Sequence, residues 1–360
     1  MNSVNMIANG QHTLHEIFSQ PQCWTASLKR LAASPELAAA AQSARPGAEW
    51  VFIGCGTSYY LAQAAAATFN HLKLPARAVP GSDILLYPSL TLQPGRDYIP
   101  VVISRSGRTS EAVRAAHLLE KDLDIRTIAI TCADGQPLEA ASSIVLKLLD
   151  ADEESTVMTR SFTSMLLGLQ YLGATVAGDD GFRCALVELP GQVMPLMRDT
   201  PNRLQEFAAA HNFSDFVFLA QGPLFGIASE CMLKVTESSC SYSQVFHSLE
   251  FRHGPKSIVS PETLLTFFIS ETSADAEVEL LEEMKALGGV TLVIGNHLSR
   301  RARLAADFAI ELGLTVPEYA RPAAFTIWGQ LFGVYYGIKK GLNPDAPKNL
   351  TRVVELADHQ

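Results

Sequence analysis

The chain has 360 residues, 48% of them hydrophobic, and a formal net charge of −9 at pH 7. This length and composition predict a globular protein of two domains. An acidic chain without a basic cluster argues against nucleic acid or an anionic membrane as a partner. The N-terminus lacks a signal-peptide pattern, and no stretch approaches the roughly 18 apolar residues of a membrane span, so we expect a cytoplasmic protein.

Four regions are predicted in chain order. A helical arm covers residues 1–44, a first α/β domain 45–185, a second α/β domain 205–345, and a tail 346–360. In both domains short β-branched strands alternate with amphipathic helices, which is typical of a parallel sheet covered on both faces. The Pro190-Gly191 region and a charged helix over residues 198–211 are predicted to join the two domains.

An internal repeat supports this division. Residues 49–56 are similar to residues 215–222, an offset of 166, and the strand at 101–104 is similar to 267–270 at the same offset. We therefore predict a duplicated domain, with two doubly wound parallel sheets of one flavodoxin-like, three-layer topology.

The first strand, residues 50–53, is followed by a small-residue loop that contains Thr57 and Ser58, and then by an alanine-rich helix over 61–69. Cys55 lies in this loop and could be a nucleophile, but the surrounding sequence offers no paired base. The six cysteines are scattered and form no Cys-x-x-Cys pair or zinc-type pattern. We therefore expect reduced thiols, no metal and no cofactor.

A second loop, Ser104-Arg105-Ser106-Gly107-Arg108-Thr109, follows the apolar strand 99–103 and precedes a helix. Hydroxyl groups, guanidinium groups and a helix N-terminus together favour a bound phosphate, although such loops are common turns as well. Neither loop is a Walker A or G-x-G-x-x-G motif, which argues against ATP and NAD. The matching segment 270–275 has two carboxylates and no guanidinium, so only the first domain is expected to bind phosphate.

A helix over 228–237 places Glu230, Lys234 and Glu237 on one face, because they are four and three residues apart. We predict that Lys234 pairs with Glu230, which leaves Glu237 free. A solvated charged face is the alternative interpretation. His253 follows in a Gly-Pro turn between two cations, and a carboxylate with an imidazole would suffice for sugar ring opening and enolisation.

These motifs together resemble the sugar isomerase (SIS) domain family, specifically the duplicated isomerase half of glutamine:fructose-6-phosphate amidotransferase and stand-alone aminosugar-phosphate deaminase/isomerases. The resemblance covers nearly the whole chain. The matching segments are 55–58, 104–109, 159–163, 233–237, 250–255 and 347–350.

The resemblance implies that Glu237 is the base that moves a proton between C1 and C2 of a sugar, supported by Glu230 and Lys234. It implies that His253 opens the sugar ring and comes from the neighbouring subunit of a homodimer. Thr57 would lie near the sugar hydroxyls. The implied ligands of the 6-phosphate are Ser58, Ser104, Arg105, Ser106 and Thr109.

Some residues depart from the amidotransferase pattern. Arg105 replaces a glutamine, which should strengthen phosphate binding. Arg352 replaces a lysine that engages the sugar carbonyl, and a guanidinium can hold an oxyanion but cannot form a Schiff base. Met158 replaces a sugar-contacting serine. No glutaminase domain precedes residue 45, so we expect no use of glutamine.

The resulting prediction is a phosphosugar aldose–ketose isomerase that acts on a hexose 6-phosphate, above all an amino sugar 6-phosphate, with release of ammonia. The alternatives within the enzymes are a fructosamine-6-phosphate deglycase, a plain isomerase and a glutaminase-less aminotransferase-like subunit. A non-catalytic phosphosugar sensor is the alternative from another class, although sensors usually carry a DNA-binding segment and this sequence shows none.

Overall fold

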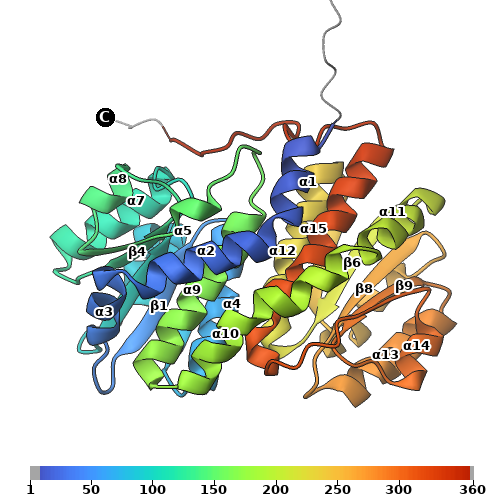
Figure 1. Cartoon of the computed structure of the whole chain (residues 1–360), viewed down its shortest axis with the longest axis horizontal. Coiled ribbons are helices and arrows are strands. Elements are labelled where there is room, and N and C mark those ends of the chain that lie inside the picture. The colour runs from blue at the N-terminus through green and yellow to red at the C-terminus, as the bar shows by residue number, and fades with distance from the viewer. Residues whose placement is uncertain (1–8, 357–360) are drawn as a thin grey trace, which may run out of the picture.

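The computed structural model describes residues 9–356 and contains two five-stranded sheets that lie side by side (Figure 1). Their strand orders, β2-β1-β3-β4-β5 and β10-β9-β8-β6-β7, are the same order when each set is numbered along the chain. All recorded strand pairs are parallel, which confirms the two predicted parallel sheets. The strands are β1 (Glu49–Gly54), β2 (Ala76–Pro80), β3 (Tyr98–Ile103), β4 (Ile128–Thr131), β5 (Ile144–Lys147), β6 (Asp215–Ala220), β7 (Ser243–His247), β8 (Thr263–Ile269), β9 (Val290–Gly295) and β10 (Phe308–Glu311).

Helices cover both faces of the first sheet, so its central strands are apolar throughout. Trp50 and Phe52 of β1 point into one core, and Val51 points into the other, because neighbouring strand residues face opposite sides. The first core includes residues of α2 (Gln20–Ala32), α4 (Thr57–His71) and α9 (Arg160–Ala177), and the second includes residues of α5 (Gly81–Leu86), α7 (Ser110–His117) and α8 (Pro137–Ala140).

The second sheet is covered in the same way. Phe216 and Phe218 of β6 face the core that also holds the first sheet, whereas Val217 faces a separate cluster. The helices on the shared side are α11 (Thr200–Ala210), α12 (Phe225–Ser239) and α15 (Pro322–Lys339), and those on the separate side are α13 (Ala274–Ala286) and α14 (Arg300–Ala305).

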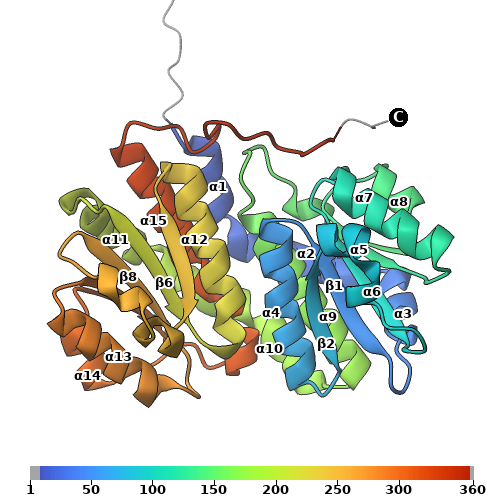
Figure 2. The same ribbon diagram turned by 180° about the vertical axis from the view of Figure 1, so that it is seen from behind.

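Three glycines of α15 allow α12 to approach closely. A Cβ atom at Gly333 would come within 2.9 Å of the Lys234 carbonyl oxygen, and those at Gly329 and Gly337 would collide with Cys231 and Ser238. On its other side α12 runs antiparallel to α4, because Gly226 meets the backbone of Ala64 while Lys234 reaches Thr57. The end of α12 therefore lies beside the start of α4 in the centre of the molecule (Figure 2).

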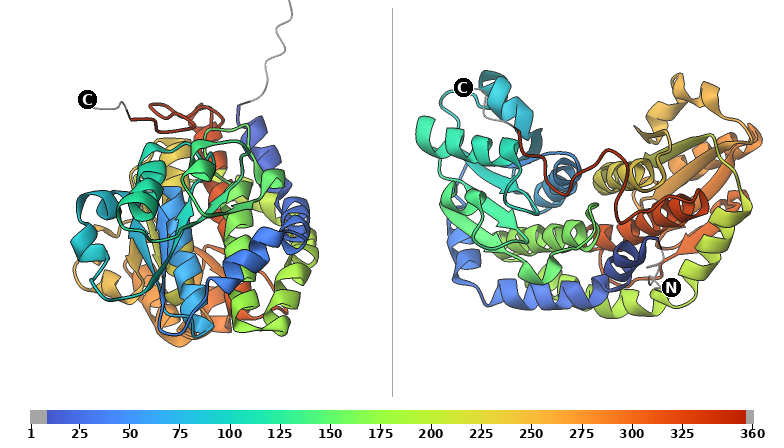
Figure 3. Two further views of the ribbon diagram at one scale, coloured as in Figure 1. Left: turned by 90° about the vertical axis from the view of Figure 1, so that its left-hand side faces the viewer. Right: turned by 90° about the horizontal axis from the view of Figure 1, so that it is seen from above.

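Three further helices, α1 (Gln11–Phe18), α2 and α3 (Pro35–Gln42), precede β1. After α15 the chain runs back across the top of the molecule to the first sheet (Figure 3). Asp345 on this returning segment accepts hydrogen bonds from the Thr13 N–H (2.8 Å) and hydroxyl (2.7 Å) of α1. Residues 1–8 of the predicted arm and 357–360 of the predicted tail lie outside the described residues.

The structure corrects two local predictions. The helix expected from residue 61 begins at Thr57, so Thr57 and Ser58 form its first turn. The proposed linker around Pro190 is helical, because Pro190 lies inside α10 (Asp180–Val193).

Candidate active site

A cavity of 260 Å³ lies where β1 and β3 end and the helices that follow them begin. Its wall combines the start of α4, the loop between β3 and α7, the segment before α9, the end of α12 and the returning tail. The predicted site residues that line it are Thr57, Ser58, Arg105, Ser106, Thr109, Glu237 and Arg352.

The loop between β3 and α7 presents hydroxyl groups to this cavity. Ser104, which is buried, donates a hydrogen bond of 3.3 Å to the Thr109 hydroxyl, and Ser106 accepts one of 3.2 Å from the Arg108 N–H. Gly107 has a φ of +63°, and a Cβ there would meet Gln136 at 2.8 Å, so the turn requires glycine. Thr109 immediately precedes α7, whose N-terminus carries partial positive charge.

A buried charge cluster forms the opposite side. Lys234 is 1% exposed and contacts both Glu237, at short range, and Glu230, at 3.4 Å. It also donates a hydrogen bond of 3.2 Å to the Thr57 hydroxyl, which joins α12 to α4. The prediction that Glu237 is left free is therefore wrong: Glu237 lies one turn further along the helix and shares the ammonium with Glu230.

The protonation states in this cluster follow from its burial. Burial raises the pKa of the Glu230 carboxyl to about 8, against the attraction of Lys234 and with a further rise from Glu237. Burial by itself lowers the pKa of Lys234, but the attraction of Glu230 and Glu237 outweighs it and the net shift is upward. Lys234 is thus a cation and Glu230 carries a proton near neutral pH, which makes Lys234 and Glu237 the effective ion pair.

Arg105 does not present its charge as the sequence led us to expect. Its guanidinium is 3.2 Å from the buried Glu153 carboxylate and donates to the carbonyl oxygens of Thr156 (3.0 Å) and Arg352 (2.9 Å). We predicted that the Arg105 guanidinium would strengthen phosphate binding. In the folded chain its N–H groups instead bond to these three acceptors, because the segments that contain Glu153, Thr156 and Arg352 pack around the guanidinium.

The tail covers the cavity of its own chain. Thr351, Arg352, Val353 and Val354 line the cavity, but the Arg352 guanidinium turns outward to Asp152 at 2.6 Å. The Val354 carbonyl accepts a hydrogen bond of 3.2 Å from the Ser110 N–H at the start of α7.

His253 lies apart from this group. It is exposed and is not among the cavity-lining residues. It follows a short helical turn (Leu249–Arg252) in the second unit, by which we mean the sheet of β6–β10 with its helices, the first unit being the sheet of β1–β5 with its helices. None of the described residues around the cavity is a histidine.

Several residues at or behind the cavity were not predicted. Glu111, Thr156, Val157 and Leu233 line it, and Glu153 lies behind Arg105. The acidic run 152–154 reads as a solvated surface, so only its burial in the folded chain identifies Glu153. For Cys55, burial and the nearby Glu111 raise the thiol pKa to about 11, which keeps the thiol protonated and unsuited to be a nucleophile.

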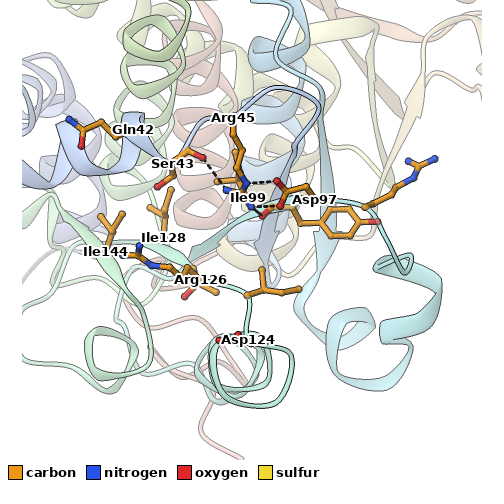
Figure 4. Close-up of a pocket in the computed structure, with 13 residues that line it drawn as sticks. Gln42, Ser43, Arg45, Asp97, Ile99, Asp124, Arg126, Ile128 and Ile144 are labelled. Atoms are coloured by element: carbon orange, nitrogen blue, oxygen red, sulfur yellow. Dashed lines mark hydrogen bonds and ion pairs between the residues drawn. The ribbon is translucent and has the colours of Figure 1, made fainter.

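A larger cavity of 420 Å³ lies at the opposite edge of the same sheet, where the strands begin (Figure 4). Its central guanidinium, Arg45, bonds to the Asp97 carboxylate and to the Tyr98 carbonyl oxygen at 3.0 Å. The Arg45 charge is therefore already neutralised. Ligands of such sheets bind instead at the carboxyl ends of the strands, which favours the smaller cavity.

Among residues 9–356, no group of three or more histidine, cysteine or acidic residues is placed to hold a metal ion. Within the same part of the chain, no helix has both the length and the apolar character needed to cross a membrane.

Comparisons with known proteins agree with this architecture. The profile of the SIS domain family matches residues 49–173. A D-galactosamine-6-phosphate deaminase of Shewanella sp. strain ANA-3 is 28% identical over 93% of this chain and 87% of its own length. The crystal structure of a glucosamine-6-phosphate deaminase from Thermotoga maritima superposes with a TM-score of 0.76 at 27% identity, covering 96% of this chain and 100% of that one.

A glutamine–fructose-6-phosphate aminotransferase (isomerizing) of Pyrobaculum aerophilum is 25% identical over 95% of this chain, which corresponds to 57% of that protein. The chain thus spans about half the length of the aminotransferases that it matches.

Proposed function

Because the chain carries a SIS domain over residues 49–173, we propose that it converts an amino sugar 6-phosphate and water to a ketose 6-phosphate and ammonia. The observation that carries this proposal is the junction of the Lys234–Glu237 pair with the hydroxyl-rich loop in one cavity. Such a cavity offers a proton-transferring group on one side and an anion cradle on the other.

In this proposal the phosphate lies between the starts of α4 and α7. Ser58, Ser106 and Thr109 supply hydroxyl donors there, and Ser104 orients the Thr109 hydroxyl through its own hydrogen bond. The helix N-termini add favourable partial charge. Binding of the 6-phosphate holds C1 and C2 of the sugar in position, so binding energy from the phosphate favours the reaction at those carbons. Arg105 takes no direct part in this step, because its donors face other acceptors.

The Glu237 carboxylate then removes the proton from C2 of the open-chain sugar and returns it to C1. The electron pair of the C2–H bond passes through an enolamine, and protonation at C1 leaves an imine at C2. Water adds to that imine and ammonia leaves, so that atoms balance. Lys234 contacts the Glu237 carboxylate and fixes its position, and Thr57 accepts a hydrogen bond from Lys234 and borders the sugar.

Ring opening needs an acid–base group besides Glu237, and no histidine is among the described residues that line the cavity of one chain. We propose that His253 of a second copy supplies it, which makes the protein a homodimer. Co-expressing two differently tagged inactive chains, one with Glu237→Gln and one with His253→Ala, tests this. Mixed dimers should regain activity that neither variant has alone, whereas inactivity of the purified mixed dimers would contradict a shared site.

The test of the reaction itself is ammonia release from glucosamine 6-phosphate, galactosamine 6-phosphate and a fructosamine 6-phosphate, with ketose phosphate measured in parallel. Equimolar ammonia and ketose phosphate from one of the first two supports the proposal. Release only from the fructosamine would replace it by deglycation, and interconversion of phosphosugars without ammonia would replace it by plain isomerisation. Binding of fructose 6-phosphate without turnover of any substrate would indicate a sensor.

A further inference from the structure

Arg105 joins three segments of the chain that are far apart in sequence. It follows β3, is 4% exposed, and reaches Glu153 before α9 and the carbonyl of Arg352 on the tail. Arg105 and Arg352 are 247 residues apart in the chain. A single side chain thus connects three parts of the cavity: the loop after β3, the segment before α9 (the wall) and residues 351–354 of the tail (the roof).

The carboxylate that fixes Arg105 is itself rigidly held. Glu153 is fully buried and accepts hydrogen bonds from the Thr159 N–H at 2.6 Å, the Thr159 hydroxyl at 2.8 Å and the Ser161 N–H at 3.1 Å. The next residues are held by α1, because the Glu16 carboxylate accepts the Glu154 N–H at 2.6 Å. Glu153 therefore fixes one edge of the guanidinium and leaves the other edge directed at carbonyl groups.

We propose that Arg105 is a positioning residue that clamps the tail over the cavity, so that the roof formed by residues 351–354 is in place before any ligand arrives. The planar guanidinium suits this task, because its bond to Glu153 fixes the direction of the donors that reach the two carbonyls, whereas a flexible ammonium keeps no such fixed geometry. The assignment of the roof to a substrate site rests on the proposed function, but the clamp itself does not.

The chain offers a matched control in Arg321 of the second unit. It is 6% exposed, pairs with Glu271 and donates to the Val316 carbonyl at 2.5 Å, but makes no hydrogen bond to the described part of the tail, residues 346–356. Arg105→Gln and Arg321→Gln each remove one buried guanidinium. Glu153 is fully buried, whereas Glu271 is 47% exposed and keeps a hydrogen bond from Asn296, so Arg105→Gln should lower stability more. Only the first should loosen the tail.

The primary measurement is the rate of trypsin cleavage after Lys348 and Arg352 in the full chain without ligand. We expect about tenfold faster cleavage for Arg105→Gln than for the unaltered protein, because protection there reflects local opening, and less than about twofold for Arg321→Gln. Equal cleavage rates for Arg105→Gln and the unaltered protein, or equal acceleration by Arg321→Gln, would overturn the clamp.

Arg105→Lys separates the clamp from simple charge balance. It retains a cation beside Glu153 and should recover thermal stability while leaving tail cleavage accelerated. Full recovery of tail protection by lysine would show that the fork is not needed. The double variant Arg105→Gln/Glu153→Gln has no unpaired buried charge, and it should also show accelerated cleavage; protection of its tail would count against the proposal.

Binding distinguishes the clamp from a direct phosphate ligand. If Arg105 acts through the tail, Arg105→Gln should raise the KM for the sugar phosphate about tenfold with little change in kcat, because only the closed fraction binds. Its affinity for inorganic phosphate alone should change by less than about threefold. Loss of inorganic phosphate binding with an intact, protected tail would make Arg105 a ligand instead. Since cleavage is measured without substrate, failure of the ammonia assay would leave the clamp standing.

Discussion

The two units share one strand order but treat the ends of their strands differently. In the first unit, the loop after β3 leaves its hydroxyl groups facing a cavity. In the second, the Glu277 carboxylate fills the equivalent place and accepts from the Ser248 hydroxyl at 2.7 Å, the Ser270 N–H at 3.0 Å and the Ser273 hydroxyl at 2.8 Å. Hydrogen-bond donors at the end of a strand and the start of a helix favour a bound anion. In the second unit the Glu277 carboxylate of the chain itself occupies that position.

The two partners of the ion pair at this edge are also exchanged between the units, and the carboxylate of the second unit is 47% exposed. Glu271, which matches Arg105 at the offset of 166, pairs with Arg321, whereas Arg105 pairs with Glu153. Glu111 matches Glu277 at the same offset but lines the cavity. The difference teaches that an internal carboxylate can occupy an edge of the sheet that stays open in the other unit, where we propose that an external anion binds.

The largest effect is expected at Glu237. Glu237→Gln should lower kcat by about a thousandfold through loss of the proton-transferring group, while fructose 6-phosphate binding stays within about threefold, as isothermal titration can measure. His71, which matches Glu237 at the offset of 166 and stacks on Tyr319, is the control, and His71→Gln should leave kcat unchanged. An active Glu237→Gln enzyme would remove the proposed base.

The next prediction compares the hydroxyl loop of the first unit with the matching segment of the second unit. Ser106→Ala should raise the KM for the sugar phosphate by about 10–100-fold, the worth of one hydrogen bond to a charged group. Thr272→Ala, at the matching position of the second unit, should leave KM unchanged. If both substitutions changed KM equally in steady-state kinetics, the proposal that only the first unit binds the phosphate would be wrong.

Glu277→Ala should lower the free energy of unfolding by about 2 kcal/mol, because buried donors lose their acceptor, and should leave KM within about twofold. Urea denaturation with intrinsic fluorescence measures the first quantity. An unchanged stability would show that Glu277 does not act as the internal anion of the second unit.

The last prediction concerns pH. The Glu230 pKa is about 8 in the folded chain against an ordinary 4.5, so between these pH values the folded state retains a proton that the unfolded state has lost. This group therefore stabilises fully below pH 4.5 and loses its contribution as pH rises to 8. Relative to the unaltered protein, Glu230→Gln should gain at least about 1.4 kcal/mol between pH 5 and pH 8.5. A pH-independent difference in urea unfolding would contradict this.

The fold was largely predictable because its signals are local. Alternating strands and helices and the repeat at 166 residues indicate two parallel sheets without any knowledge of contacts between them. The hydroxyl loop was also predictable, since strand, loop and helix are contiguous and Ser58, Ser106 and Thr109 do line one cavity.

The partners of the charged groups were not predictable, because they depend on distant segments. Helical spacing allows Lys234 to reach Glu230 or Glu237, and only the packing against Thr57 of α4 shows that it contacts both. Glu237 lines the cavity of the first unit because α12 and α4 are antiparallel, which no local pattern encodes. The orientation of Arg105 likewise depends on Glu153, 48 residues away.

The hydrogen bonds between Thr13 and Asp345 join the first described helix to a segment that is synthesised after all the strands. The ribosome makes α1 before either sheet, but the residue that caps this helix follows all ten strands. Glu16 of α1 secures the wall beside Arg105, and residues 351–354, made later still, supply the roof. All ten strands are therefore made before the residues that cover the cavity, so the cavity can be covered only at the end of synthesis.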